Sequence, residues 1–84
     1  MKPIKFSNHA LTYINRRGFT IEEVEKAIKE SKWIFNKRNK YECFLDIPFN
    51  KEWNGKIYET KQIKPIFVEE EKEIVVITVY TFYF

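Results

Sequence analysis

Residues 7–20 read SNHALTYINRRGFT, and this stretch decides how the N-terminal part of the chain folds. Ser7 is a typical N-cap residue, because its hydroxyl can accept a hydrogen bond from a free N–H group of the first helical turn. The residues that then share one face at helical spacing are Ala10, Tyr13, Ile14 and Arg17. Gly18 predicts the end of this helix, since glycine adopts the left-handed C′ conformation at little cost.

A second helix is predicted to begin directly after this stop. Thr20 and Glu23 have the spacing of a capping box, in which each side chain bonds to the other residue's amide. The expected buried stripe of this helix is Ile21, Val24, Ala27 and Ile28.

After Ser31 the apolar residues alternate with period two, which is typical of strands. Residues 3–6 are expected to pair as a short edge strand. The other expected strands are 33–35, 41–47, 57–61, 63–68 and 74–82, with a polar turn at 36–40, a loop at 48–55 and an acidic hairpin loop at 69–73. Pro65 is expected at an edge or a bulge, or where a strand is divided, because it cannot donate to a ladder.

This order of elements predicts an α+β fold within one domain, residues 1–84. We expect two N-terminal helices packed on one face of a mainly antiparallel sheet of about four or five strands. The last strand, apolar on both of its faces, is expected in the middle of the sheet.

The composition narrows the possible classes of protein. The chain has one cysteine, Cys43, which excludes an intrachain disulfide and a cysteine-based zinc site. No metal or cofactor is expected. The sequence also shows no signal peptide and no apolar run long enough to cross a membrane, so we expect a cytoplasmic protein without a membrane partner.

The net charge of +3 is unevenly distributed. Residues 1–20 contain two lysines and two arginines but no acid, and residues 32–40 contain three lysines and one arginine but no acid. If the fold brings the two stretches together, they form a patch suited to phosphate. The alternative is that they are two separate, solvated segments.

Three motifs, in this order, resemble a small bacterial family of unknown function. They are Ser-x-His-Ala at residues 7–10, Arg17-Gly18 before an acidic helix, and Val-Ile-Thr-Val-Tyr at residues 76–80. The family is similar to the RelE/BrnT-like toxins of toxin–antitoxin modules. The resemblance implies a RelE-like fold with a curved sheet, an activity on RNA or the ribosome, and an antitoxin partner.

The same resemblance places the family's histidine at His9 and its arginine at Arg17. The family often has a second arginine four positions after the histidine, where this chain has Tyr13, and Arg16 could supply that charge. On a helix of about 100° per residue, His9, Tyr13 and Arg16 lie within roughly 60° of one another, with Arg17 beside them.

These residue types suit metal-independent cleavage of RNA. Such a reaction needs a base for the 2′-hydroxyl, a cation for the charge on the phosphorus oxygens and an acid for the leaving oxygen. His9 lies near a helix N-terminus, which disfavours the imidazolium and favours a neutral base. Arg16 and Arg17 can bind phosphate bidentately, and Tyr80 could supply a phenol. The phosphate-binding candidates of the basic turn are Lys37, Arg38 and Lys40.

Each candidate also has a purely structural explanation. His9 could cap or pack, Tyr80 could pack in its strand, and the basic turn could be simply polar. Arg17 could tie its helix to the sheet or to an acid such as Glu42 or Asp46. Cys43 is expected to be a small core residue.

Two further hypotheses concern the whole protein. It could be a non-catalytic domain that binds a protein or a nucleic acid, because a charge of +3 is low for an RNA-binding protein. It could also be a homodimer in which the aromatic end, residues 80–84, is buried or pairs as an edge strand.

Overall fold

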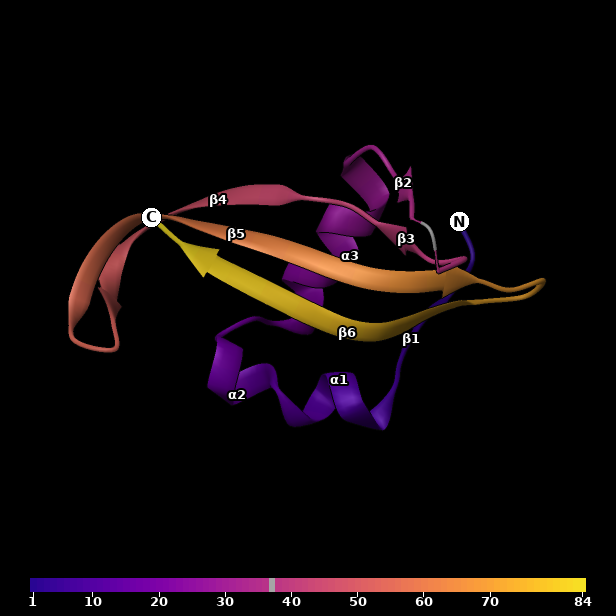
Figure 1. The fold of residues 1–84 in the computed structure, drawn as a ribbon, viewed down its shortest axis with the longest axis horizontal. Coiled ribbons are helices and arrows are strands. Elements are labelled where there is room, and N and C mark those ends of the chain that lie inside the picture. Colours follow the sequence, from indigo (N-terminus) through magenta and orange to yellow (C-terminus); the bar gives the residue numbers. More distant parts are fainter. Residues whose placement is uncertain (37) are drawn as a thin grey trace.

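The computed structural model describes residues 1–36 and 38–84, and it shows an α+β fold (Figure 1). Helices come early in the described chain and most strands come late. The elements in chain order are β1 (Ile4–Phe6), α1 (Asn8–Thr12), α2 (Ile14–Arg17), α3 (Ile21–Glu30), β2 (Ile34–Phe35), β3 (Tyr41–Glu42), β4 (Leu45–Trp53), β5 (Lys56–Glu69) and β6 (Ile74–Tyr83). The predicted change from helices to strands is therefore confirmed.

The first predicted helix is divided into α1 and α2, so the prediction of one continuous helix is wrong. The break falls at Tyr13, whose φ of −96° and ψ of 4° leave the helical region. Just before it, the Thr12 hydroxyl donates to the carbonyl of Asn8 at 2.8 Å. Such a bond from a side chain to the previous turn competes with the helical ladder and bends helices.

Both ends of this helical region are nevertheless where the sequence predicts them. The Ser7 hydroxyl accepts a hydrogen bond from the Ala10 amide at 3.1 Å, which is the expected N-cap. Gly18 has φ 73° and ends α2 in the left-handed conformation.

The capping box at the start of α3 is confirmed. The Thr20 amide donates to Glu23 at 2.9 Å, and the Glu23 amide donates to the Thr20 hydroxyl at 3.1 Å. Val24, Ala27 and Ile28 are buried as predicted. Ile21 is 39% exposed, contrary to its predicted burial, because as the first residue of α3 it lies at the helix end.

The described strands form an open sheet in the order β1-β6-β5-β3-β2, and β4 also pairs with β5. β1 runs parallel to β6, and all the other pairs are antiparallel. β3 and β4 pair with successive parts of β5, so the predicted strand 41–47 is in fact two strands. Within the part of the chain that the structure describes, the sheet thus has six strands rather than four or five. β6 lies between β1 and β5, which confirms its predicted interior position.

The predicted loop at 48–55 is wrong over most of its length. β4 continues to Trp53 and stays paired with β5, and the chain turns only at Asn54 and Gly55, with φ of 50° and 86°. Pro48 and Asn50 read as loop residues in the sequence. They mark instead a shift in register between β4 and β5, where Asn50 has φ 50°.

Pro65 neither divides its strand nor lies at an edge, since β5 is continuous from Lys56 to Glu69 and pairs on both sides. Pro65 has a register partner on β6 but none on β3 or β4. It lies opposite the interruption between those two strands. A residue without an N–H group is tolerated there because no ladder donor is needed.

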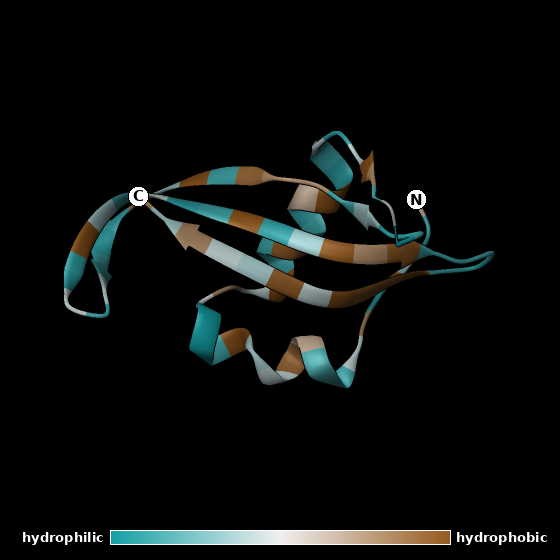
Figure 2. Ribbon diagram, in the orientation of Figure 1, coloured by the Kyte–Doolittle hydropathy of each residue, from teal (hydrophilic) through white to brown (hydrophobic). Residues whose placement is uncertain are grey.

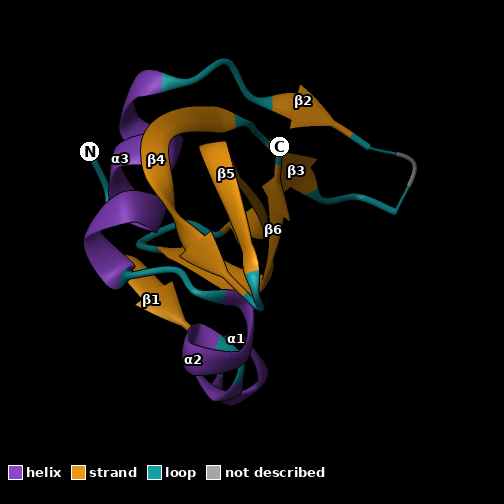
Figure 3. Cartoon of the chain, turned by 90° about the vertical axis from the view of Figure 1, so that its left-hand side faces the viewer, coloured by secondary structure: helices purple, strands orange, loops and turns teal. Residues whose placement is uncertain are grey.

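The helices pack on the sheet in different places. α3 contacts β5, and α1 contacts β6. Figure 3 shows α3 on one side of the sheet, with α1 and α2 below it. Figure 2 shows the first part of β6 as uniformly hydrophobic and its later part as mixed. The buried apolar residues are Ala10, Phe19, Val24, Ala27, Ile28, Cys43, Ile63, Phe67, Ile74, Val76 and Val79.

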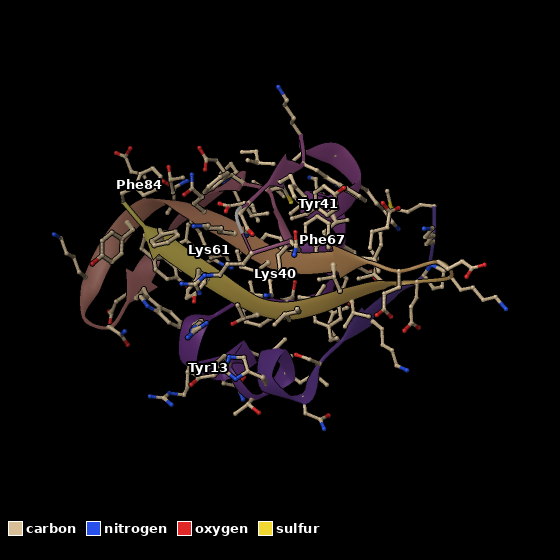
Figure 4. The ribbon with its side chains drawn as sticks, turned by 45° about the vertical axis from the view of Figure 1, so that its right-hand side comes forward. Tyr13, Lys40, Tyr41, Lys61, Phe67 and Phe84 are labelled. Atoms are coloured by element: carbon tan, nitrogen blue, oxygen red, sulfur yellow. The ribbon has the colours of Figure 1, made fainter. Side chains whose placement is uncertain are left out.

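A buried lysine ties the helices to the sheet. Lys61 of β5, labelled in Figure 4, is only 7% exposed. Its Nζ donates to the Gly18 carbonyl at 3.0 Å and lies 2.9 Å from a carboxylate oxygen of Glu23. A buried ammonium needs such partners, so Lys61 holds the α2–α3 connection against β5.

Across residues 1–36 and 38–84, the structure contains no helix that is long and apolar enough to span a membrane.

Candidate nucleic-acid interface

A β-bulge in β6 decides which of its side chains face the open side of the sheet. The register with β5 shifts so that Ile77 is an extra residue on β6. Val76, before the bulge, and Val79, after it, are both buried, although strict alternation would place them on opposite faces. Thr78 and Tyr80 therefore lie on the face opposite Val79, and Tyr80 is 42% exposed.

Arg17 is fixed against the edge of β6. Its Nη1 donates to the Val79 carbonyl at 2.8 Å and to the Thr78 hydroxyl at 3.2 Å. Its guanidinium carbon lies 4.0 Å from the ring centre of Tyr13 and 4.8 Å from that of Tyr80. Of the two structural alternatives for Arg17, the structure shows the tie to the sheet rather than a bond to an acid.

Three candidate side chains of the N-terminal helices surround Tyr13. His9 lies one helical turn before it, with the two ring centres 4.9 Å apart. Arg17 lies one turn after it, and the guanidinium carbon of Arg16 is 5.4 Å from the same ring. His9 and Arg16 are exposed, so solvent reaches both groups. Together with Tyr80, these residues form a row from α1 across α2 to β6, which we call the His9–Tyr80 row.

The basic turn lies close to this row. A cleft of about 480 Å³ is lined by Asn36, Arg38, Lys40, Ile66, Ile77, Thr78 and Tyr80. Two of its lining residues, Thr78 and Tyr80, also contact Arg17, so the guanidinium adjoins the cleft.

The structure thus brings together most of the predicted site residues. His9, Arg16, Arg17 and Tyr80 belong to the His9–Tyr80 row, and Arg38 and Lys40 line the adjoining cleft. The seventh, Lys37, lies outside the described residues.

Lys64 and Phe44 join this surface without having been predicted. Lys64 Nζ lies 5.4 Å from the ring centre of Phe44 and 5.9 Å from that of Tyr80. It also forms an ion pair with Glu42 at 3.4 Å. The sequence offers only the alternation of β5 as a signal for Lys64, because its neighbours on the surface come from β3, from the connection between β3 and β4, and from β6.

Cys43 is a core residue, as predicted. It is fully buried, and its Sγ donates to the Ala27 carbonyl at 3.4 Å. Burial, together with the nearby Glu42 carboxylate, raises the pKa of the thiol to about 11. The thiol is therefore protonated at neutral pH and unsuited to act as a nucleophile.

Fold and surface together define a small α+β domain with an open, mainly antiparallel sheet and a cleft beside its last strand that is lined by basic residues and Tyr80. Among the described residues, no cluster of His, Cys, Asp and Glu side chains is arranged to hold a metal ion. The chain belongs to the family described as "Domain of unknown function (DUF4258)", whose model matches residues 6–81. Neither a curated protein nor a solved structure gives a significant match.

Proposed function

We propose that this protein acts on RNA in the manner of the RelE/BrnT-like toxins that its motifs resemble, as a metal-independent endoribonuclease or an inhibitor of translation. The observation that carries the proposal is the cleft. Its lining includes the cations Arg38 and Lys40 and the exposed Tyr80, whose ring contacts the Arg17 guanidinium. Cations and aromatic rings gathered at one groove are the usual features of a site for RNA.

The proposed chemistry assigns one task to each group. His9 removes the proton of a 2′-hydroxyl, which attacks the adjacent phosphorus, and the bond to the 5′-oxygen breaks. Tyr80 protonates that leaving oxygen, so the products are a 2′,3′-cyclic phosphate and a 5′-hydroxyl. Arg16 and Arg17 stabilise the negative charge on the phosphorus oxygens.

A second candidate function is binding without cleavage, and one contact favours it. Tyr13 stands between His9 and Arg17 along the helical region and contacts both side chains. It occupies the position of the second family arginine and separates the candidate base from the main cation. In this version the domain binds a nucleic acid or a protein through the same surface.

The two candidates are separated by incubating the purified protein with an end-labelled RNA in the presence of EDTA. We expect cleavage by the wild type, little or none by His9→Ala or Tyr80→Phe, and a weaker reaction after Arg38→Ala combined with Lys40→Ala. The matched control is Lys26→Ala combined with Lys29→Ala, which removes two exposed cations from α3 and should leave cleavage unchanged.

Expression in bacteria provides a second measurement. A toxin-type activity predicts growth arrest, or stalled synthesis in a cell-free translation mixture, that an antitoxin protein relieves. RNA binding without cleavage selects the non-catalytic function. A wild type that neither binds RNA, nor cleaves it, nor slows translation refutes the proposal.

A further inference from the structure

The open face of the sheet carries a row of aromatic side chains beyond the cleft. Phe82 and Phe84 follow Tyr80 at alternate positions along the strand. The exposed fraction is 42% for Tyr80, 44% for Phe82 and 58% for Phe84. The ladder includes Phe84, since its N–H group and its carbonyl both bond to Thr60. Alternate residues of a strand lie on one face about 6.6 Å apart. Figure 4 shows Phe84 at one end of the sheet.

The residues between these rings point to the opposite face, which confirms the alternation. The Tyr83 hydroxyl donates to the Arg17 carbonyl at 2.8 Å, and the Thr81 hydroxyl donates to the same carbonyl at 2.5 Å. On the open side, Phe44 is 39% exposed and shares Lys64 with Tyr80. Phe44, Tyr80, Phe82 and Phe84 therefore share one face, which we call the aromatic platform.

The charges around the aromatic platform favour an anion. Its cations are Arg17 at the β6 edge, Arg38 and Lys40 in the cleft, and Lys64 between the rings. Its acids are Glu42, which is paired with Lys64, and Asp46, which accepts a hydrogen bond from Gln62. Lys64 and Glu42 offset each other, and Asp46 keeps its negative charge because Gln62 is neutral, so the cations Arg17, Arg38 and Lys40 outnumber this one acid. Exposed aromatic rings in a row indicate a missing ligand.

We infer that the aromatic platform binds successive bases of single-stranded RNA, with the adjoining phosphates held by Arg38 and Lys40. Any base can stack on an exposed ring, so this mode tolerates many sequences. A duplex cannot use the platform, because its base faces are stacked inside the helix. The inference rests on the proposed function and adds to it the form of RNA that is recognised.

The test is fluorescence anisotropy with a labelled RNA of about twelve nucleotides, as a single strand and annealed to its complement. We expect the single strand to bind at least about tenfold more tightly than the duplex. Phe82→Leu should weaken binding of the single strand by about fivefold to tenfold, because leucine keeps the apolar surface but loses the stacking. The matched control is Phe35→Leu. Phe35 is 59% exposed but packs on Tyr41, on the face of the sheet opposite the aromatic platform, so its replacement should leave the affinity for RNA unchanged.

Salt dependence separates stacking from phosphate contact. Phe82→Leu should leave the slope of log Kd against log salt concentration unchanged, whereas Arg38→Ala should reduce it by about 0.7.

Equal affinity for strand and duplex overturns the inference, as does an unaltered Kd for Phe82→Leu when Arg38→Ala still weakens binding. A mass measurement in which the wild type is a dimer and Phe82→Leu a monomer assigns the platform to a second copy and also overturns it. Absence of any RNA binding refutes the proposed function itself.

Discussion

Replacement of Arg17 by alanine should destabilise the fold, whatever the protein does with RNA. The side chain donates from Nη1 to the Val79 carbonyl at 2.8 Å, and a hydrogen bond from a charged donor contributes about 1.5–3 kcal/mol. The contacts with Tyr13 and Tyr80 add about 0.5–1 kcal/mol each at a half-exposed site. Discounting for solvent, we expect a loss of about 2–4 kcal/mol.

That loss is a large part of the free energy of unfolding expected for a domain of this size. Stabilities of about 0.05–0.15 kcal/mol per residue give roughly 4–13 kcal/mol for the whole chain. Urea denaturation, followed by the fluorescence of Trp33 and Trp53, measures the change, and an unchanged m-value shows that the same surface unfolds. Arg17→Lys should lie between wild type and Arg17→Ala, because an ammonium keeps one hydrogen bond but loses the planar stacking.

Arg16→Ala is the matched control. Arg16 is exposed and contacts the Tyr13 ring at 5.4 Å, so its loss should change the free energy of unfolding by no more than about 0.5 kcal/mol. If Arg17→Ala and Arg16→Ala destabilise equally, the structural role assigned to Arg17 is refuted. Any loss of activity in Arg17→Ala has to be compared with this measurement before a catalytic role is assigned.

Gly18→Ala should cost more than about 2 kcal/mol, because Gly18 has φ 73° and an added Cβ would lie 2.5 Å from the Tyr83 hydroxyl. Gly55→Ala, with φ 86° and open space around it, should cost only the backbone strain of about 1 kcal/mol. Equal losses of stability for the two glycine variants in thermal or urea unfolding would contradict this. Cys43 has a folded pKa raised from 9.0 to about 11, by burial first and by Glu42 second. Its contribution to stability is therefore complete below pH 9 and is lost as the pH rises through 11. Urea midpoints from pH 8 to 11 should fall more steeply for the wild type than for Cys43→Ala, and parallel curves would show that the thiol does not titrate as described.

Local signals account for the parts of the fold that the sequence predicted correctly. The Ser7 cap, the Gly18 stop and the Thr20–Glu23 capping box each depend on neighbouring residues, and all three are present. The predicted continuous helix failed at Tyr13, although its stripe pattern is regular. One side-chain hydrogen bond from Thr12 accompanies that break, and periodicity contains no information about it.

The site was predictable to the extent that it lies on one helical face. His9, Tyr13 and Arg17 follow at successive turns, and their contacts agree with that spacing. The proposal that Tyr80 and the basic turn belong to the same site as these residues came from residue type and resemblance alone. The sequence does not indicate Lys64, because its neighbours Glu42, Phe44 and Tyr80 come from distant parts of the chain.

The sequence by itself determined the α+β class, through the change from helical to strand periodicity, and the helix caps, which depend on contacts between residues close along the chain. Only the tertiary structure determined which side chains of the last strand lie on the open face of the sheet. The bulge at Ile77 changes the alternation of β6, and it thereby sends Tyr80 and Phe82 to the open face and Tyr83 to the helices. Register is a property of two strands together, so no pattern within one of them could reveal which side chains would meet the basic turn.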